Sequence, residues 1–343
     1  MLTKQMAEEL RYYARSERHL QALQTWLDTA KPSYPASVAS GGSDVVQTKL
    51  FPLLKTQTLG GAVLFSPALA STQTLLHETL QPSAPAGLLC YTELQTSGKG
   101  RGSNTWSSPE GCLTFSFKSA FVDGNTLPFV QYLVSLAIIK AVETVHAVSA
   151  SSNPDSANTV RIKWPNDIYA NKVKIGGILC QSEYRDGKFS VTTGSHRHQH
   201  LEPGADALSP GHLGHGAESL RRLQVSLQPP TAIAYGSCID NGLSVCREEF
   251  LAAFCNAYEP MEELFREKGF EPFMADYLAR WLHTNQVVQV ASGDDGSGAK
   301  MPAVIKGLTS TGCLLAEADG SRLELYPDGN SFDFLSGLLK RKL

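Results

Sequence analysis

VRIKWPNDIYANKVKIGGIL, residues 160 to 179, is the segment whose architecture can be predicted most directly. Residues 161–164 are typical of a short strand, which Pro165 ends because proline has no N–H to donate to a strand pair. Residues 168–194 then read as further short strands separated by two clusters of turn residues. The sequence therefore predicts three antiparallel strands that follow one another closely, as part of a mixed α/β fold.

The polar residues of this segment lie where a cleft is expected. Asn166 and Asp167 follow the end of the first strand, and Lys174 returns on the neighbouring strand one hairpin later. With Lys163, they would bring an amide, a carboxylate and two ammonium groups together. An ordinary set of surface ion pairs, each worth under about 1 kcal/mol, would use the same residue types.

A second polar motif, SGKGRG at residues 97–102, has three glycines and two cations. Glycine lets backbone N–H groups approach an anion closely, and Lys99 and Arg101 would add positive charge. Turn and loop residues follow, so the motif is not a dinucleotide-binding fingerprint, and the glycine after Lys99 excludes the Walker pattern. An exposed flexible loop is the alternative. Together with the first segment, the motif indicates a site for a carboxylate and phosphates, as acyl-adenylate formation requires.

The composition is that of a soluble globular protein. The 343 residues are 42% hydrophobic, and a net charge of -3 gives no basic field, so we expect no nucleic-acid partner. The seven cysteines lack CxxC spacing and are odd in number, which favours reduced thiols inside the cell. No apolar run of membrane-spanning length and no secretory signal is found, so we expect no membrane partner. We expect a cytoplasmic protein, with an alternative upstream start as the route to a plastid or mitochondrial form.

Three domains are expected along the chain. Residues 1–47 are interpreted as an amphipathic helix, within residues 3–30, and a linker. Residues 48–285 are expected to form the catalytic domain, and short strands joined by Gly and Asp turns predict a small β-barrel in residues 286–343. One further strand and three helices are predicted in the catalytic domain, at 112–117, 128–148, 248–267 and 270–283.

Residues 195–222 break these patterns and are interpreted as a disordered insertion. The segment is rich in Gly and Pro and holds five of the nine histidines. His196, His198 and His200 could ligate zinc, but no cysteine partner is near them, so a functional metal site is not expected.

Three stretches resemble biotin protein ligase, in the form of the plant-type holocarboxylase synthetases. They are QTSGKGRGSNTWSSPEGC, VRIKWPNDIYANKVKIGGIL and YPDGNSFDFLSGLLKRK, and the resemblance covers about residues 48–194 and 225–343. It implies a mixed-sheet α/β (α+β) catalytic domain related to class II aminoacyl-tRNA synthetases, followed by an SH3-like barrel. The reaction implied has two steps: biotin and ATP, with Mg²⁺, give biotinyl-5′-AMP, and a lysine of a biotin carboxyl carrier domain then takes the biotin and releases AMP.

The resemblance also implies roles for individual residues. Ser71, Thr72 and Gln73 match a Ser-Thr-Asn segment that binds the biotin ureido ring, with Gln for Asn as a departure, and Gln95 matches a second biotin contact. The other implied positions are Gly98, Lys99, Gly100 and Arg101 in the loop over the adenylate, Lys174 at the biotin carboxyl and phosphate, and Lys163, Trp106, Asn166 and Asp167 at the nucleotide. Buried packing is the alternative for the tryptophan. Lys174, Arg101 and Asp167 are the expected catalytic residues, and Asp167 is also the expected Mg²⁺ ligand or the group that orients the acceptor amine.

The sequence departs from the family at one place. The expected glycine-Ile/Val-glycine-Leu-Asn segment is absent, because Gly194 is followed by SHRHQH, and the lost strand would leave a neighbour in the sheet unpaired. A retained intron or misjoined exon is one explanation, and a real variant with weakened activity is the other. Two alternative functions therefore stay open: a lipoate-protein ligase with the same chemistry, and a weakly active or non-catalytic biotin or nucleotide binder. Transcriptional repression is not expected, since no helix-turn-helix pattern precedes the catalytic domain.

Overall fold

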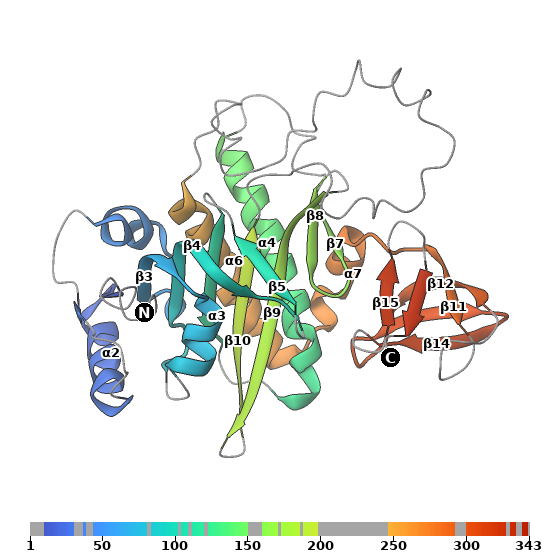
Figure 1. Cartoon of the computed structure of the whole chain (residues 1–343), viewed down its shortest axis with the longest axis horizontal. Helices are drawn as coiled ribbons and strands as arrows, with labels where there is room; N and C mark the ends of the chain where they lie inside the picture. The colour runs from blue at the N-terminus through green and yellow to red at the C-terminus, as the bar shows by residue number, and fades with distance from the viewer. Residues whose placement is uncertain are drawn as a thin grey trace.

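A ten-stranded mixed sheet is the centre of the fold in the computed structural model (Figure 1). The structure describes residues 10–30, 37–38, 44–80, 84–101, 104–108, 112–119, 123–149, 160–170, 173–185, 188–197, 246–291, 300–326, 330–333 and 338–341. The strands follow the order β2-β1-β3-β4-β6-β10-β9-β8-β7, with β5 paired to β4. Their bounds are Arg11–Ala14 (β1), Ser37–Val38 (β2), Ala62–Leu69 (β3), Leu89–Lys99 (β4), Thr105–Ser108 (β5), Leu113–Lys118 (β6), Val160–Lys163 (β7), Asp167–Ala170 (β8), Val173–Arg185 (β9) and Lys188–Arg197 (β10).

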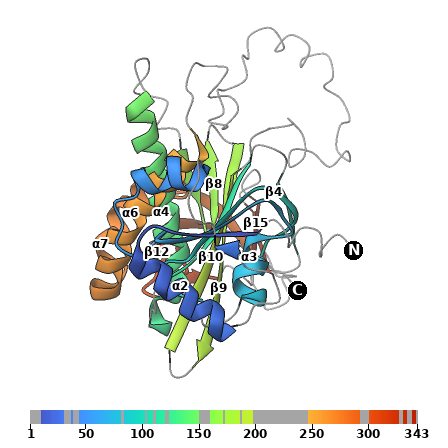
Figure 2. The ribbon, with the colours of Figure 1, turned by 90° about the vertical axis from the view of Figure 1, so that its left-hand side faces the viewer.

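Helices cover both faces of this sheet. Figure 2 shows α4, α6 and α7 against one face and α3 on the other. The first face carries the larger core, in which the ring of Phe115 lies 4.9 Å from that of Phe254, and Phe117 lies 4.9 Å from Tyr258. The helices are Glu17–Ala30 (α2), Thr72–Thr74 (α3), Leu127–Ser149 (α4), Arg247–Lys268 (α6) and Glu271–Arg280 (α7), with short π or 3-10 turns at Val46–Leu50 (η2), Phe51–Leu53 (η3), Leu75–Thr79 (η4) and Gly124–Thr126 (η5).

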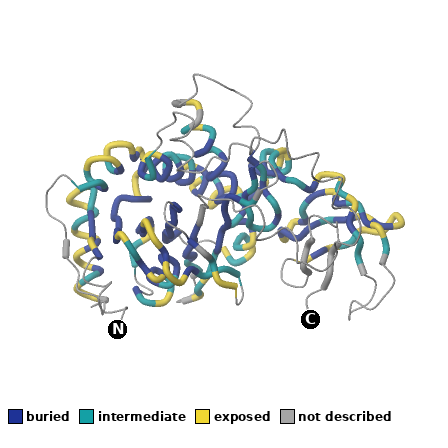
Figure 3. Tube along the Cα trace, turned by 45° about the horizontal axis from the view of Figure 1, so that its top comes forward, coloured by how far each residue is buried: buried dark blue, intermediate teal, exposed yellow. Residues whose placement is uncertain are grey.

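Helix α4 is apolar on most sides, as the sequence predicts. By length and composition Gly124–Val145 would also suit a membrane span, contrary to the expectation that no apolar run reaches this length, but 67% of its apolar 18-residue window is buried inside the protein. Figure 3 shows the buried residues running through the sheet and the helices packed on it, whereas the outer side of α2 is exposed. The apolar composition of α4 is therefore accounted for by its position in the core.

The N-terminal segment differs from the predicted helix. Helix α2 confirms the second half of the prediction, but residues 11–14 form β1, which pairs antiparallel with β3. Tyr12 and Tyr13 explain the difference: both are fully buried, and they belong to different core clusters on opposite faces of the sheet. Adjacent residues point to opposite faces only in a strand. Of the predicted linker, residues 37–38 form β2 beside β1, and residues 31–36 and 39–43 lie outside the described residues.

The predicted run of three antiparallel strands is confirmed as β8, β9 and β10. Strand β10 continues through residues 195–197 and lies between β6 and β9, with Gly194 opposite Ser116. The expectation that the sheet lacks a strand here, and that the insertion begins at residue 195, is therefore wrong: the backbone of SHR supplies the pairing whatever its side chains are. Residues 198–245, with the remaining histidines of the segment, lie outside the described residues.

The C-terminal residues form a second sheet of six strands, in the order β14-β13-β12-β11-β16-β15. The short strands predicted in residues 286–343 are confirmed. Their bounds are Val287–Ala291 (β11), Lys300–Leu308 (β12), Leu314–Ala318 (β13) and Ser321–Leu325 (β14), followed by Asn330–Asp333 (β15) and Leu338–Arg341 (β16). The helices predicted at 128–148, 248–267 and 270–283 are confirmed as α4, α6 and α7, the last ending three residues earlier. The predicted domain boundaries stay a prediction.

A buried histidine at the junction of the two sheets gives a testable pH dependence. His283 is fully buried, and its burial lowers its pKa to about 4. Between about pH 4 and pH 6.5 the unfolded chain therefore binds a proton that the folded chain does not, so the free energy of unfolding rises with pH across this window, by up to about 3 kcal/mol. Urea unfolding of the wild type and of His283→Gln, at several pH values from 4.5 to 7, measures this. The variant is expected to have the smaller slope, and equal slopes would contradict the assignment.

Candidate active site

Residues 97–101 of the glycine-rich motif form the end of β4 and the start of its connection to β5, and Gly102 lies outside the described residues. Gly98 is opposite Trp106 in this pair, and the N–H of Gly100 donates a 2.9 Å hydrogen bond to the carbonyl of Asn104. A Cβ at Gly98 would lie 2.6 Å from Nε2 of Gln95 and 2.7 Å from the carbonyl oxygen of Trp106. Both contacts are shorter than a real Cβ allows, so the loop depends on glycine at this position.

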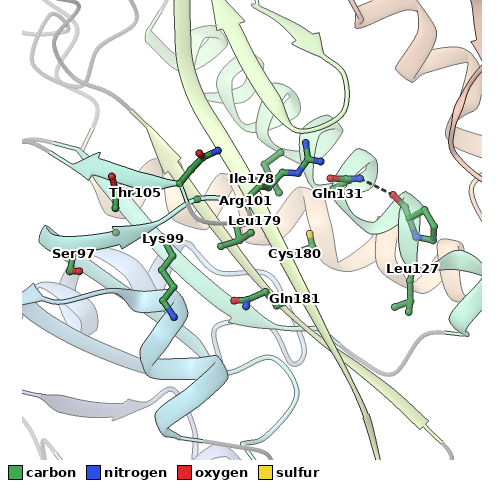
Figure 4. A pocket seen from close by; sticks show the side chains of 14 residues that line it. Ser97, Lys99, Arg101, Thr105, Leu127, Gln131, Ile178, Leu179, Cys180 and Gln181 are labelled. Carbon is green, nitrogen blue, oxygen red and sulfur yellow. Dashed lines mark hydrogen bonds between the residues drawn. The ribbon is translucent and has the colours of Figure 1, made fainter. Parts of the chain in front are cut away.

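A cavity of about 730 Å³ opens beside this loop (Figure 4). Three elements meet there: the glycine loop, the middle of β9 and the first turn of α4. The lining residues are Ser97, Gly98, Lys99, Gly100, Arg101, Asn104, Thr105, Leu127, Pro128, Gln131, Ile178, Leu179, Cys180 and Gln181. The four loop residues predicted from the sequence, Gly98, Lys99, Gly100 and Arg101, therefore line this cavity.

The two cations of the loop point in different directions (Figure 4). Lys99 forms an ion pair with Glu78 of η4, in which both side chains are 44% exposed. Arg101 reaches the other way, and its Nη1 donates a 3.3 Å hydrogen bond to Oδ1 of Asn166. The structure thus brings Arg101 to the turn between β7 and β8, whereas Lys99 is drawn toward the opposite side of the loop.

The predicted meeting of Asn166, Asp167 and Lys174 is found. Nζ of Lys174 lies 2.9 Å from Oδ1 of Asp167, and 5.0 Å from the centre of the Trp106 ring. Asn166 is held on β9 twice, because its Nδ2 donates to the carbonyl of Ile178 (2.8 Å) and its own carbonyl accepts from the N–H of Ile178 (2.9 Å). An amide, a carboxylate and two cations, Arg101 and Lys174, therefore form one connected group, with a tryptophan ring beneath the ammonium.

Lys163 does not join this group. Its Nζ lies 3.5 Å from the hydroxyl of Tyr169 and 5.4 Å from the centre of that ring. The geometry assigns it to the β7–β8 hairpin, where it pairs in register with Asp167, rather than to the cavity wall. Among the residues described, no cluster of three or more His, Cys, Asp or Glu side chains stands close enough to hold a metal ion.

The residues of the Ser-Thr-Gln segment form, with Gln95, a buried polar cluster. Ser71 caps α3, accepting a hydrogen bond from the N–H of Thr74 (3.2 Å). Oε1 of Gln95 accepts from the N–H of Thr72 (2.9 Å) and from its hydroxyl (3.2 Å). All of these side chains except that of Thr74 are at least 95% buried, so their polar atoms need partners or a ligand.

Gln73 leaves one such atom open. Its Nε2 donates to Oε1 of Gln181 (2.8 Å) and to the carbonyl of Thr192 (3.0 Å), whereas its Oε1 is buried without a hydrogen-bond partner. A Cβ at Gly194 would lie 2.8 Å from this oxygen, so the two residues approach closely and a larger residue at position 194 would collide with the amide. A buried acceptor without a donor costs about 1–3 kcal/mol, which a ligand N–H could recover.

Burial also shifts the pKa values of three side chains near the site. It lowers the pKa of Lys118, which is 3% exposed, and that of His77 on η4, to which the charge of Lys118 contributes a further decrease. Burial raises the pKa of Cys180 in the cavity wall to about 12, so its thiol stays protonated near neutral pH. Lys99 and Arg101 line the cavity, and Lys174 lies near it at Trp106, so these side chains bring positive charge to the site.

Several lining residues were missed from the sequence. Gln131, Leu127 and Pro128 belong to the start of α4, where Pro128 indicates only the beginning of a helix. Residues 178–181 follow the KIGG stretch and read as a buried strand, with no signal for which of its faces meets a cavity. These residues become visible as site residues only when the sheet order is known, because β9 reaches the loop through pairs that are distant in sequence.

An enzyme that activates a carboxylate with a nucleotide needs cations beside a loop that can approach phosphate. The fold and the site have these features, so they define the class of carboxylate-activating, nucleotide-dependent enzymes. The family model described as "Biotin/lipoate A/B protein ligase family" matches residues 65–196. Biotin–protein ligase 2 of Arabidopsis thaliana is 38% identical over 84% of this chain and 80% of its own length. Chloroplastic biotin–protein ligase 1 of the same plant is 37% identical over 84% and 71%. The chain belongs to this family, as one of its biotin–protein ligases.

The fold agrees with this assignment. The biotin protein ligase from Aquifex aeolicus, solved in complex with biotin and ATP, aligns with a TM-score of 0.50 and 21% identity, over 77% of this chain and 94% of that chain. At this identity the likeness concerns the fold alone. It supports the mixed α/β architecture with a mixed sheet that the sequence predicts.

Substitution of Gly98 tests the close packing of the loop. In Gly98→Ala the added methyl group would meet Gln95 and the Trp106 carbonyl, so the loop or Gln95 must move. We expect the Kd for biotin, measured by isothermal titration calorimetry, to rise at least about tenfold, which is about 1.4 kcal/mol. Gly307→Ala is the control, because a Cβ there meets nothing within 4 Å. Unchanged biotin binding by Gly98→Ala would show that the loop accommodates a side chain at this position, contrary to the expectation.

Proposed function

We propose that this biotin–protein ligase forms biotinyl-5′-AMP from biotin and ATP and transfers the biotin to one lysine of a biotin carboxyl carrier domain, in acetyl-CoA carboxylase or a related carboxylase. The observation that carries the proposal is the connected group of Lys174, Asp167, Asn166 and Arg101 beside the cavity of the glycine loop. This group supplies fixed positive charge at the point where a carboxylate and a triphosphate must approach each other.

The first step needs this charge because both reactants are anions. The biotin carboxylate attacks the α-phosphorus, a new C–O–P linkage forms, and the bond to pyrophosphate breaks. Lys174 and Arg101 would lower the barrier by stabilising charge as it moves to the leaving group. Asp167 has a supporting role in this scheme, since its 2.9 Å ion pair with Lys174 fixes the position of the ammonium group.

The buried polar cluster of residues 71–73 and Gln95 would hold the ring end of biotin. A ureido ring carries two N–H donors and a carbonyl acceptor, and the open Oε1 of Gln73 is an acceptor that such an N–H satisfies. Gln in place of the family's Asn extends this amide, so that its Nε2 reaches both Gln181 and Thr192. The departure from the family pattern is therefore compatible with biotin binding.

The second step requires the adenylate to survive until a carrier domain arrives. An acyl adenylate hydrolyses in water, so the loop over it must exclude solvent and then release the product. The hydrogen bond from Arg101, which lines the cavity, to Asn166 joins the loop to the β7–β8 turn. An acceptor amine then attacks the mixed anhydride, AMP leaves, and an amide bond remains on the carrier.

Mg²⁺ is proposed only as a companion of ATP. Mg²⁺ that comes with a nucleotide is held by phosphates, waters and one or two carboxylates. Asp167 is a carboxylate at the proposed nucleotide end of the site. When bound, the ion would neutralise phosphate charge. Because Lys174 occupies one oxygen of Asp167, its second oxygen is the atom left for the ion or for the acceptor ammonium.

The finer features of the fold belong to the same proposal. We infer that the six-stranded C-terminal sheet is an SH3-like barrel and that the catalytic domain is related to class II aminoacyl-tRNA synthetases. The strand count and the short turns of the C-terminal sheet support the first inference. The mixed sheet and the glycine loop of the catalytic domain support the second. A cytoplasmic location is proposed from the reduced cysteines alone, six of which have no disulfide partner in the described residues.

A reconstituted reaction tests the proposed function. The purified chain is supplied with MgATP, biotin and a recombinant biotin carboxyl carrier domain, and pyrophosphate release and covalent biotin on the carrier are measured. We expect biotin-dependent release and labelling of one carrier lysine. Lys174→Met is expected to slow adenylate formation at least about 100-fold, because one charge-stabilising donor is lost. Lys306→Met, at a surface pair 4.0 Å from Glu317 in the C-terminal sheet, is the control.

Two outcomes of this experiment favour the alternatives. Pyrophosphate release with lipoate but not with biotin would identify a lipoate-protein ligase. Binding of biotin or ATP without pyrophosphate release would identify a non-catalytic binder, as the altered sequence after Gly194 allows.

Replacement of Arg101 tests retention of the intermediate. Arg101→Gly removes the contact with Asn166, so the loop loses its attachment to the β7–β8 turn. We expect adenylate formation to remain largely intact, because Lys174 still supplies the larger part of the charge stabilisation, while biotinyl-5′-AMP appears in solution and labels lysines indiscriminately. Mass spectrometry of a bystander protein in the reaction measures this labelling.

Lys99→Ala is the comparison for this variant, since Lys99 pairs with Glu78 of η4 and not with the β7–β8 turn. It is expected to release less adenylate than Arg101→Gly. If Arg101→Gly labels only the carrier lysine, the loop does not retain the intermediate through this residue.

A further inference from the structure

A buried chain of hydrogen bonds joins the C-terminal sheet to the polar turn of the site. The hydroxyl of Tyr132, on α4, donates to the carbonyl of Gly312 (2.5 Å) and accepts from Nε1 of Trp164 (2.7 Å). Gly312 lies in the turn between β12 and β13, and a Cβ there would lie 3.2 Å from Pro128 and 3.4 Å from the Tyr132 ring. Tyr132 and Trp164 are 1% and 3% exposed, so these bonds form away from water.

The backbone of Trp164 is held from the same direction. Its N–H donates to Nε2 of His283 (3.0 Å), and the other ring nitrogen of His283 bonds Oε1 of Gln286 (2.8 Å). Because Nε2 must accept, the imidazole is neutral with its proton on Nδ1, which agrees with its lowered pKa. The backbone carbonyl of Gln286 accepts a hydrogen bond from the N–H of Ile305 in β12 (2.9 Å). The side chain and the backbone N–H of Trp164 are therefore both connected to the second sheet.

Trp164 directly precedes the residues of the site. Pro165 follows it, then Asn166 and Asp167, which meet Arg101 and Lys174. Proline fixes its own φ and restricts the residue before it, so little rotation is available between Trp164 and Asn166. A shift of Trp164 is therefore passed to the amide and carboxylate of the turn.

We propose that Tyr132 is a positioning residue for the nucleotide end of the site: it fixes the turn that carries Asn166 and Asp167 by tying Trp164 to the Gly312 turn of the C-terminal sheet. This deepens the proposed function and rests on it. Tyr132 touches neither substrate, and its effect is on where Asn166 and Asp167 stand.

The neighbouring Tyr277 separates this role from packing. Its ring lies 4.9 Å from that of Tyr132 in the same fully buried cluster, and its hydroxyl has no hydrogen-bond partner among the described residues. Ring packing in this cluster therefore does not require a bonded hydroxyl. The hydroxyl of Tyr132 is distinguished by its two partners, one on each side of the junction.

Removal of one oxygen atom tests the proposal. Tyr132→Phe and the matched control Tyr277→Phe each lose a buried hydroxyl and keep the ring. For Tyr132→Phe we expect kcat/KM for ATP in biotinyl-5′-AMP formation to fall about tenfold, with the Kd for biotin within about twofold of the wild type. Hydrogen exchange at the Trp164 amide, which needs no turnover, is expected to become faster. Tyr277→Phe is expected to change none of the three.

The outcomes separate this inference from the proposed function. If the wild type forms no biotinyl-5′-AMP, the proposed function is wrong, and the exchange measurement alone decides the inference. If the wild type is active but Tyr132→Phe behaves like Tyr277→Phe, the positioning role is wrong. Equal losses toward ATP and biotin would also overturn it, because they indicate a general loss of structure.

A second pair of variants covers failure of Tyr132→Phe to fold. His283→Gln keeps an acceptor for the Trp164 N–H, and His283→Leu does not. We expect His283→Gln to retain at least about half of the wild-type kcat/KM for ATP, and His283→Leu to lose about tenfold with the biotin Kd unchanged. Equal activity of the two variants would overturn the proposal.

Discussion

The two-way hydrogen bonding between Asn166 and Ile178 is the constraint on which the site depends. Asn166 both donates to and accepts from the backbone of Ile178, so the turn after β7 is fastened to β9 rather than to its own hairpin. This brings Asp167 opposite Gly177, within reach of Lys174, and leaves Oδ1 of Asn166 available to Arg101. Without it, the amide of Asn166 would not be held where Arg101 of the glycine loop reaches it.

A second long-range set of hydrogen bonds, to Glu259, fixes the segment before β3. Glu259 of α6 is 8% exposed and accepts backbone hydrogen bonds from Thr58 and Leu59, each 2.7 Å, although about 200 residues separate them. A buried carboxylate is stable there because several N–H donors surround it. It fixes the segment that leads into β3, and β3 in turn ends just before the Ser-Thr-Gln segment. The segments proposed to bind biotin and the nucleotide are thus each connected by hydrogen bonds to a helix that packs on the larger core of the sheet.

Sequence reasoning reached those parts of the site that depend on neighbouring residues. The β8–β9–β10 run follows from turn residues between β-type segments, and the meeting of Asp167 with Lys174 follows from that hairpin. What it missed depends on pairs distant in sequence. The Lys99 ion pair requires η4 beside the loop, and the apolar stripe that predicted a helix at residues 3–30 is equally compatible with a strand whose adjacent tyrosines enter two different cores.

The altered segment after Gly194 has a different meaning in the structure than in the sequence. A strand is defined by its backbone, and β10 pairs with β6 and β9 through Arg197, so the sheet tolerates a sequence that lacks the expected glycine-Leu-Asn pattern. The proposed biotin site depends on side chains, and there glycine at position 194 is needed because a Cβ would lie 2.8 Å from Oε1 of Gln73. The departure therefore bears on the side chains beyond Gly194, and not on the pairing of the sheet. Because Gln181 and Thr192, which hold the Gln73 amide, precede the altered segment, the contact proposed between Gln73 and the ring of biotin does not depend on that segment.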